Sequence, residues 1–433
     1  MEREKPITSP TISKLKDDLN NGNESALDGF WLKIGKQGAP LIEPIKDDKN
    51  HKLVTFIVRA DKDLQNVVVI CALADQYDVI SNNVCERIEN INVYYKSFVV
   101  LNGTRAIYTI SKNNSLLYGG FYENLMTNWQ TCSPDSLNSK RFVQRYRREA
   151  IRFEIEYSVL EMPDAKPRKW TLPNKNIILG NIEEMDFYSK ILNMNRKMWI
   201  YTPHDFNKKG EPYHLLIIFD GKAFLEFTQT PIILDNLQAK NSIPPVVAIF
   251  IHNYSGLQRG KDLNCYPPFA EFIAKELVPW ARKNYHISSN PKHLVTTGSS
   301  SGGLAASFIG LKYPETFGNI LSQSGYYAWY PGNIWFQRSQ HFYGKDFVHW
   351  WTEEDEKEDE WLTKQFLRSE ALPLKFYINV GNLETRAIDW VRNFRNMLQK
   401  KEFLHYYEEY PGGHEYIAWR EHLPEGLIYL IGS

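Results

Sequence analysis

The chain has 433 residues and equal numbers of acidic and basic side chains, so no global field draws it to nucleic acid or to an acidic membrane surface. Its composition, 43% hydrophobic and 24% charged, is that of a globular protein with a real core. No run of about 18 apolar residues occurs and the N-terminus lacks the apolar stretch of a secretory signal, so we expect neither a membrane span nor export.

The cysteines and histidines show no metal-binding or redox spacing. Cys71, Cys85, Cys132 and Cys265 are widely separated and form no CxxC pattern, and no HExxH motif occurs among the eleven histidines. Free thiols are typical of a reducing compartment, so we predict a cytoplasmic protein without a resident metal.

The first part of the chain predicts a small β domain, which we place at residues 1–170. Residues 1–45 are polar and predict a loosely ordered lead-in with one short helix. From 50 to about 160, β-branched runs such as "KLVTFIVRA", "NVVVICAL" and "RAIYTISK" alternate with Asp, Asn and Gly. Several short strands at this spacing indicate an antiparallel sandwich. The stretch "RFVQRYRREAIRFEIEYSVLEMP" is expected to lead out of it.

The second part, residues 171–433, predicts an α/β domain with a mostly parallel sheet. Nearly continuous apolar runs such as "YHLLIIFDG", "PPVVAIFIHN" and "LKFYINVG" are typical of buried parallel strands. Segments with helical periodicity, such as "GGLAASFIGLKYP" and "AIDWVRNFRNMLQKK", separate them. This alternation favours a parallel sheet with helices on both faces.

The stretch "HLVTTGSSSGGLAASFIGL" places three serines between a predicted strand and a predicted helix. The pattern Gly-x-Ser-x-Gly fits it only with Gly298 and Gly302 flanking Ser300, which makes Ser300 the candidate nucleophile. We expect side chains at the two glycine positions to collide in such a strained turn. The Ser301 amide is predicted to face an oxyanion, whereas a Ser/Gly turn that merely caps the helix is the alternative.

A serine nucleophile requires a general base and an acid that orients it. In this arrangement the acid and then the histidine follow the serine along the chain. His414 in "YPGGHEYIAW" is the candidate base, and His422 is a competitor expected on a solvent-facing helix. Glu384 in "GNLETRAID" is the candidate acid, with Asp389 as the alternative.

The loop after "LLIIFDG" is the expected source of a second oxyanion donor. We assign it to the backbone amide of Gly221 or Lys222. Asp220 in the same loop is predicted to be structural.

With these residues identified, the chain resembles the enterochelin (ferric enterobactin) esterases, whose catalytic domain is an esterase D-like α/β-hydrolase. The segments "FDGKAF", "QRGKDLNCYPPFAEFIAKELVPW", "TTGSSSGGLAASFIGLKYPETFGNILSQSGYYAWYP", "INVGNLE" and "PGGHEYIAWREHLPEGLIYL" are similar to that domain, in order. "VTFIVRA", "CSPDSLNSKRF" and "SVLEMPDA" are similar to the family's N-terminal domain. The resemblance covers roughly residues 30 to 433.

The resemblance implies a β-sandwich that covers part of the substrate, followed by an α/β-hydrolase domain. It implies hydrolysis of the trilactone of a catecholate siderophore, with Ser300, Glu384 and His414 as the triad and iron arriving with the substrate. Arg259 matches the family's substrate-contacting arginine, and a guanidinium suits a trianionic ferric tris-catecholate. A surface ion pair is the alternative for Arg259.

Two aromatic residues close to the serine turn in sequence, Tyr326 and Trp329, are candidates to stack on catechol rings, with core packing as the alternative. Ser301 stands where many family members carry a larger residue, so the pocket floor is expected to differ. Two functions compete with this one. The chain could be an esterase of the same fold that acts on another ester or lactone, or a siderophore-binding protein without catalytic activity. The expected partner is a small molecule, and the oligomeric state stays open.

Overall fold

A computed structural model describes residues 8–432 except 61–63, 74–79, 116–124, 126, 149–150, 254–255 and 333–350. The chain divides into two compact units. The first contains Met1–Pro167 and also two short segments from late in the sequence, Asn382–Thr385 and Pro411–Ala418. The second contains the remainder. A single boundary in the sequence therefore does not separate the two units.

The first unit is built on two antiparallel sheets. One has the order β1-β2-β5-β4, and the other has the order β3-β6-β9-β8 with β7 paired to β6. The strands are β1 (Leu41–Ile45), β2 (Asp48–Arg59), β3 (Val67–Cys71), β4 (Glu86–Arg87), β5 (Val93–Leu101), β6 (Arg105–Lys112), β7 (Cys132–Ser133), β8 (Arg141–Arg148) and β9 (Ile151–Glu161).

Facing side chains of the two sheets form one hydrophobic cluster, which we call the sandwich core. Its members come from β2 and β5 on one side and from β3, β6 and β9 on the other. This arrangement confirms the predicted β-sandwich. The stretch 141–161 does not merely lead out of the sandwich, however, because β8 and β9 pair along their length as a hairpin of the second sheet.

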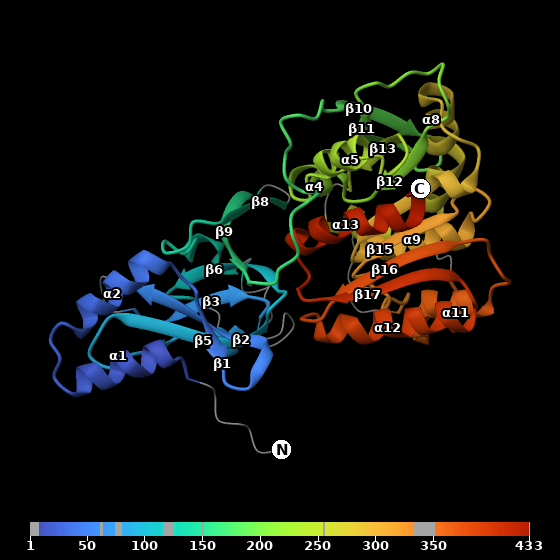
Figure 1. The fold of residues 1–433 in the computed structure, drawn as a ribbon. Coiled ribbons are helices and arrows are strands. Elements are labelled where there is room, and N and C mark those ends of the chain that lie inside the picture. The colour runs from blue at the N-terminus through green and yellow to red at the C-terminus, as the bar shows by residue number, and fades with distance from the viewer. Residues whose placement is uncertain are drawn as a thin grey trace. The chain divides into compact units, whose positions relative to one another are not determined.

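Two helices, not one, precede the sandwich: α1 (Pro10–Asn20) and α2 (Ala26–Gln37) (Figure 1). Both are amphipathic, and their apolar residues pack on the outer face of the first sheet. The alternation in β5 explains how one strand serves both sides: Tyr95 faces the helices, whereas Tyr94 belongs to the sandwich core. The prediction of a loose lead-in was wrong because the apolar residues that recur along this polar segment mark a helix face.

The second unit contains an eight-stranded sheet with the order β10-β11-β13-β12-β14-β15-β16-β17. β12 to β17 run parallel, and β10 and β11 are antiparallel additions at one side. The strands are β10 (Asn181–Ser189), β11 (Met194–Thr202), β12 (His214–Ile218), β13 (Val246–Ile251), β14 (Leu294–Ser299), β15 (Asn319–Gln323), β16 (Lys375–Gly381) and β17 (Leu404–Tyr410).

The helices that follow these strands are α4 (Gly221–Glu226), α5 (Thr230–Ala239), α6 (Gly256–Leu263), α7 (Pro267–Glu271), α8 (Val278–Tyr285), α9 (Ser301–Lys312), α11 (Trp361–Arg368), α12 (Thr385–Lys400) and α13 (Tyr416–Ile431). A π-helical turn, η3 (Phe272–Leu277), joins α7 to α8. Short 3₁₀ turns are η1 (Ile80–Asn83), η2 (Trp129–Thr131), η4 (Pro291–His293) and η5 (Asp355–Lys357). Within the described ranges, none of the helices has the length and apolar character needed to cross a bilayer.

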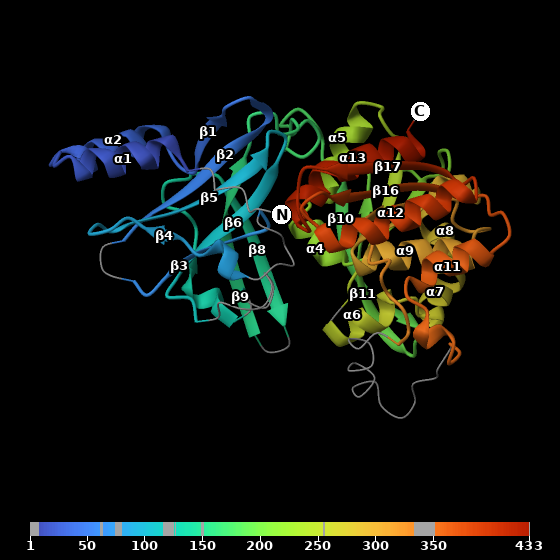
Figure 2. The same cartoon turned by 90° about the horizontal axis from the view of Figure 1, so that it is seen from below.

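Helices cover both faces of the parallel sheet, as predicted. Ile320 of β15 contacts the position of Gly310 on α9, whereas the next residue, Leu321, contacts the position of Gly426 on α13. Successive strand residues point to opposite faces, so α9 and α13 lie on opposite sides of the sheet (Figure 2). The strands between them are buried, which accounts for their continuous apolar runs.

Candidate active site

Ser300 occupies the turn between β14 and α9 with a backbone conformation that L-residues rarely adopt. Its φ is 57° and its ψ is −123°. Its N–H donates to the carbonyl of Gln323 (2.9 Å), and its carbonyl accepts from the N–H groups of Leu304 (3.1 Å) and Tyr326 (3.0 Å). Three backbone hydrogen bonds thus hold Ser300 in this strained backbone conformation.

The three glycines near Ser300 differ in how much space a side chain would have at their positions. A Cβ on Gly298 would lie 2.7 Å from the carbonyl carbon of Gly302, so Gly298 permits the close approach of strand and helix. A Cβ on Gly302 itself would find only ordinary contacts, the nearest at 3.5 Å, so the predicted collision at Gly302 was wrong. The crowded position is the next one, Gly303, where a Cβ would lie 2.4 Å from Ser322 Oγ.

The two candidate oxyanion donors begin neighbouring helices. Ser301 is the first residue of α9, after β14, and Gly221 is the first residue of α4, after the adjacent parallel strand β12. N–H groups in the first turn of a helix lack intrahelical acceptors. A Cβ on Gly221 would lie 2.4 Å from the backbone of Phe250, so only glycine lets α4 begin this close to β13. The Lys222 side chain lies 3.5 Å from Glu226.

His414 and Glu384 form a hydrogen-bonded pair. Nδ1 of His414 lies 2.6 Å from Oε2 of Glu384, whose side chain is fully buried. A carboxylate at Nδ1 favours the tautomer with its proton on that nitrogen, which makes Nε2 the basic nitrogen. The two loops are also joined through their backbones, because the N–H of Leu383 donates to the carbonyl of Gly412 (3.0 Å).

The two competing residues, Asp389 and His422, have different surroundings. Asp389 lies on α12, its side chain is 73% exposed, and it faces Arg392 at 3.6 Å. His422 lies on α13, but it is buried, so the expectation of a solvent-facing histidine was wrong. Its Nδ1 lies 3.0 Å from Glu408 and its ring stacks on Tyr410.

Arg259 lies on α6 and forms a two-pronged ion pair with Asp220. Its Nε and Nη2 atoms lie 2.7 and 2.8 Å from the two carboxylate oxygens. Asp220 is nearly buried and precedes Gly221, whereas the Arg259 side chain is 33% exposed. The pair fixes the loop that carries one candidate oxyanion donor, and a bidentate contact of this kind is geometrically demanding.

The two candidate aromatic residues have different surroundings. Tyr326 is half-buried, and its backbone binds the Ser300 carbonyl directly. Trp329 is 1% exposed and packs edge-to-face on Trp361, so the core-packing alternative describes it. Of the two, Tyr326 is the less buried, and its ring packs edge-to-face on Trp390.

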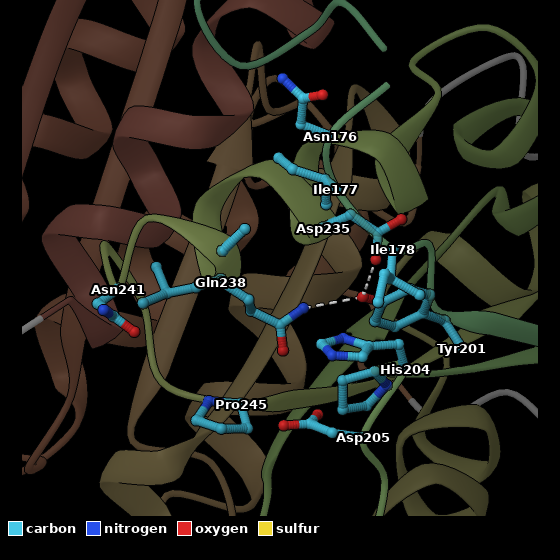
Figure 3. A pocket seen from close by; sticks show the side chains of 13 residues that line it. Asn176, Ile177, Ile178, Tyr201, His204, Asp205, Asp235, Gln238, Asn241 and Pro245 are labelled. Carbon is cyan, nitrogen blue, oxygen red and sulfur yellow. Dashed lines mark hydrogen bonds between the residues drawn. The ribbon is translucent and has the colours of Figure 1, made fainter. Parts of the chain in front are cut away.

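A cavity of about 330 Å³ lies near the start of β13 and the end of the antiparallel β11 (Figure 3). It is therefore at the amino-terminal ends of the parallel strands, whereas Ser300 follows the carboxyl end of β14. Three of the cavity's polar lining residues are joined by a chain of hydrogen bonds. Tyr201 donates to Asp235 (2.6 Å) and accepts from the side-chain amide of Gln238 (2.8 Å), whose Oε1 atom accepts from the N–H of Val246. These groups stabilise the junction of α5 with the sheet, and none of the predicted site residues lines this cavity.

One buried residue beside the pair was not singled out in the sequence. Glu415 directly follows His414, is 4% exposed, and accepts the N–H of Ile107 through Oε2 (3.0 Å). Burial, with the nearby charge of Glu384 as a smaller cause, raises the pKa of Glu415 to about 8. Its position next to the candidate base was the only available sequence signal.

The fold and the strained serine turn define an ester hydrolase with an α/β-hydrolase domain. The sequence profile of the Esterase family, described as "Putative esterase", matches residues 189–430, which is more than half of the chain. The chain belongs to this family.

Individual relatives extend the similarity to the N-terminal unit. The chain is 24% identical to the iron(III) enterobactin esterase of Dickeya dadantii over 95% of each sequence. It is 26% identical to that of Escherichia coli K12 over 63% of this chain and 62% of that protein. It is also 23% identical to an iron(III) salmochelin esterase of Escherichia coli over 97% of this chain and 98% of that protein.

Solved structures share the fold over both units. The enterobactin esterase of Shigella flexneri, determined in the presence of enterobactin, aligns with a TM-score of 0.71 and 22% identity. That alignment covers 93% of this chain and 97% of the other. The ferric enterobactin esterase of Salmonella typhimurium aligns with the same TM-score and identity, over 93% and 98%.

Proposed function

We propose that this protein is a cytoplasmic serine esterase that hydrolyses the trilactone ester bonds of a ferric catecholate siderophore. Its nucleophile, base and acid in this proposal are Ser300, His414 and Glu384. The observation that carries the triad is topological. Ser300 follows β14, Glu384 follows β16 and His414 follows β17, and the carboxyl ends of parallel strands share one edge of a sheet. The 2.6 Å His414–Glu384 pair supports their roles as base and orienting acid.

The reaction proceeds through an acyl-enzyme. Ser300 Oγ attacks a lactone carbonyl carbon and transfers its proton to Nε2 of His414. The amides of Ser301 and of Gly221 or Lys222 stabilise the oxyanion that forms. Collapse breaks the bond to the ester oxygen of the neighbouring serine unit, which takes the proton from His414.

Hydrolysis of the acyl-enzyme restores the catalyst. His414 removes a proton from water as the water oxygen attacks the acyl carbon, and the second tetrahedral intermediate releases Ser300 with that proton. The Glu384 carboxylate stabilises the imidazolium in both halves of the reaction. In this mechanism iron belongs to the substrate, and no protein-bound cofactor takes part.

The names of the relatives support the siderophore as substrate, since they include enterobactin and salmochelin esterases that align over nearly the whole chain. The partly exposed guanidinium of Arg259 is the proposed contact for the anionic ferric complex, with Asp220 orienting it. Tyr326 is the proposed stacking surface for a catechol ring. Four free cysteines agree with the proposed cytoplasmic location.

Mass spectrometry of the products tests this function. Wild-type protein incubated with ferric and with iron-free enterobactin should release linear trimer, dimer or monomer of dihydroxybenzoylserine. Ser300→Ala should lose turnover and fluorophosphonate labelling but keep substrate binding. Fast hydrolysis of a short-chain p-nitrophenyl ester, with no enterobactin products, would instead favour an esterase for another ester. Wild-type protein that binds the siderophore but neither cleaves it nor reacts with fluorophosphonate would favour the binding-protein alternative.

A further inference from the structure

The loop that carries Glu384 is packed into the N-terminal sandwich. Its segment, Asn382–Thr385, belongs to the first compact unit although β16 and α12 on either side belong mainly to the second. The half-buried side chain of Leu383 contacts the sandwich core, which includes Tyr94 and Tyr108. An apolar side chain next to the proposed acid is therefore anchored by residues far away in sequence.

The loop that carries His414 has a contact with the turn between β5 and β6. A Cβ on Gly103 in that turn would lie only 3.0 Å from Cγ of Pro411, the first residue of the segment Pro411–Ala418. The distance is shorter than most real Cβ contacts, so glycine at 103 allows the loop to approach the turn. The backbone bond between Leu383 and Gly412 connects this loop to the acid loop.

Glu415 provides the polar contact of the same loop with the sandwich. β3 pairs with β6 only as far as Cys71 opposite Tyr108, so Ile107 lies beyond the end of β3. The N–H of Ile107 is satisfied by Oε2 of Glu415 (3.0 Å) where a neighbouring strand would otherwise supply a carbonyl. A buried N–H thus finds its acceptor in one oxygen of a buried carboxyl, at a residue adjacent to the proposed base.

We propose that the N-terminal sandwich positions the acid–base pair, with Leu383 anchoring the acid loop and Glu415 tying the histidine loop to β6. This inference rests on the proposed function, and it gives the sandwich a role in orienting His414 that does not depend on covering a substrate. Glu415 is a positioning residue, because it acts through the adjacent His414.

The protonation state of Glu415 suits this role. Burial raises its pKa to about 8, so at neutral pH it is mainly a neutral carboxylic acid. A neutral group beside Glu384 adds no second negative charge near the imidazole. The carbonyl oxygen of a neutral carboxyl still accepts the Ile107 N–H. An amide can do the same, which makes glutamine the conservative replacement.

Two substitutions at position 415 test the proposal. Glu415→Ala removes the contact with Ile107, and we expect kcat on ferric enterobactin to fall about tenfold with KM changed less than about twofold, because a misoriented base affects the chemical step. The separate variant Glu415→Gln should retain most of the wild-type kcat. Glu421→Gln is the matched control and should leave kcat unchanged, since Glu421 is a buried carboxyl on α13, the helix that follows Glu415, and faces Thr171 and Arg168.

Proton NMR supplies a readout that a merely structural role would not affect. The proton between His414 and Glu384 should give a strongly downfield resonance, absent in Glu384→Ala. We expect Glu415→Ala to broaden or shift it while thermal unfolding stays cooperative.

Gly103→Ala tests the contact of the histidine loop with the turn between β5 and β6. It places a methyl group against Pro411, and we expect a several-fold lower kcat. Gly35→Ala, in a helix where a Cβ meets nothing within 4 Å, is its control.

The outcomes separate the two proposals. If Ser300→Ala retains turnover, the proposed function fails. If Ser300→Ala is inactive but folded Glu415→Ala and Gly103→Ala both keep wild-type kcat and the downfield signal, only the positioning role is overturned. Should Glu415→Ala fail to fold, the comparison of Gly103→Ala with Gly35→Ala decides, since each adds a single methyl group to the N-terminal unit.

Discussion

Two histidine–carboxylate pairs lie close together in the sequence but in different regions of the molecule. His414 pairs with Glu384 at 2.6 Å, and His422 pairs with Glu408 at 3.0 Å, in each case through Nδ1. The first pair joins two loops that follow parallel strands. The second joins the interior of α13 to β17, where the Tyr377 hydroxyl also donates to Glu408 (2.8 Å).

The comparison shows that pair geometry alone does not identify a catalytic base. The ring of His422 is stacked on Tyr410 at a centroid distance of 4.3 Å, and the carboxylate it faces is shared with a tyrosine. Such a network satisfies buried polar groups and stabilises the packing of α13. His414 differs in its place in the topology, because its loop leaves the edge of the sheet at which Ser300 also begins its turn.

Substitution of each histidine gives the largest expected contrast. His414→Ala should lower kcat by about 10³- to 10⁴-fold, since the serine loses its base. His422→Ala should leave kcat within about twofold and reduce the free energy of unfolding by about 1–3 kcal/mol, through the lost hydrogen bond and the cavity. Steady-state turnover of ferric enterobactin and urea unfolding measure the two effects. Equal losses of kcat in both folded variants would contradict the distinction.

Substitution of each acid sharpens the same contrast with a somewhat smaller effect. Glu384→Gln presents an amide to Nδ1, disfavours the required tautomer and should lower kcat by about 10²- to 10³-fold. Glu408→Gln should affect stability only. Asp389→Asn, an exposed residue on the helix after Glu384, is the control for the alternative acid. Full activity of Glu384→Gln together with loss in Asp389→Asn would reverse the assignment of the acid.

Glu415 extends the comparison to a carboxyl that holds its proton. Its folded pKa of about 8 lies above the ordinary value of 4.5. Its contribution to stability is therefore fully present below pH 4.5 and is lost as the pH rises through about 8, because the unfolded chain releases the proton first. Each pKa unit corresponds to about 1.4 kcal/mol, and with relaxation of the buried site we expect a loss of about 1–3 kcal/mol.

The measurement is urea unfolding of wild type and Glu415→Gln at pH 5 and pH 8.5. The glutamine variant cannot ionise, so the difference in its free energy of unfolding between the two pH values should be smaller by that amount. An identical pH dependence in the two proteins would mean that Glu415 is ionised at neutral pH in the folded state.

The predicted nucleophile and its setting depended on local patterns. A buried strand, a glycine-rich turn and a helix are contiguous in sequence, and the Gly-x-Ser-x-Gly spacing singles out Ser300, whose φ of 57° is found in the turn. Alternating strands and helices likewise predicted the parallel sheet, and short β-branched runs predicted the sandwich. Periodicity and turn chemistry act over a few residues, so one sequence can reveal them.

The tertiary structure decided which distant side chains meet. It paired Glu384 with His414, left Asp389 exposed, buried His422 and Trp329, and brought Leu383, Pro411 and Glu415 against the N-terminal sandwich. Sequence spacing carries no information on these contacts, because they depend on how loops from separate strands converge and on what remains exposed after packing. The sequence alone therefore determined the fold class and the serine turn, whereas the partners of His414 and the packing of its loop against β6 required the assembled fold.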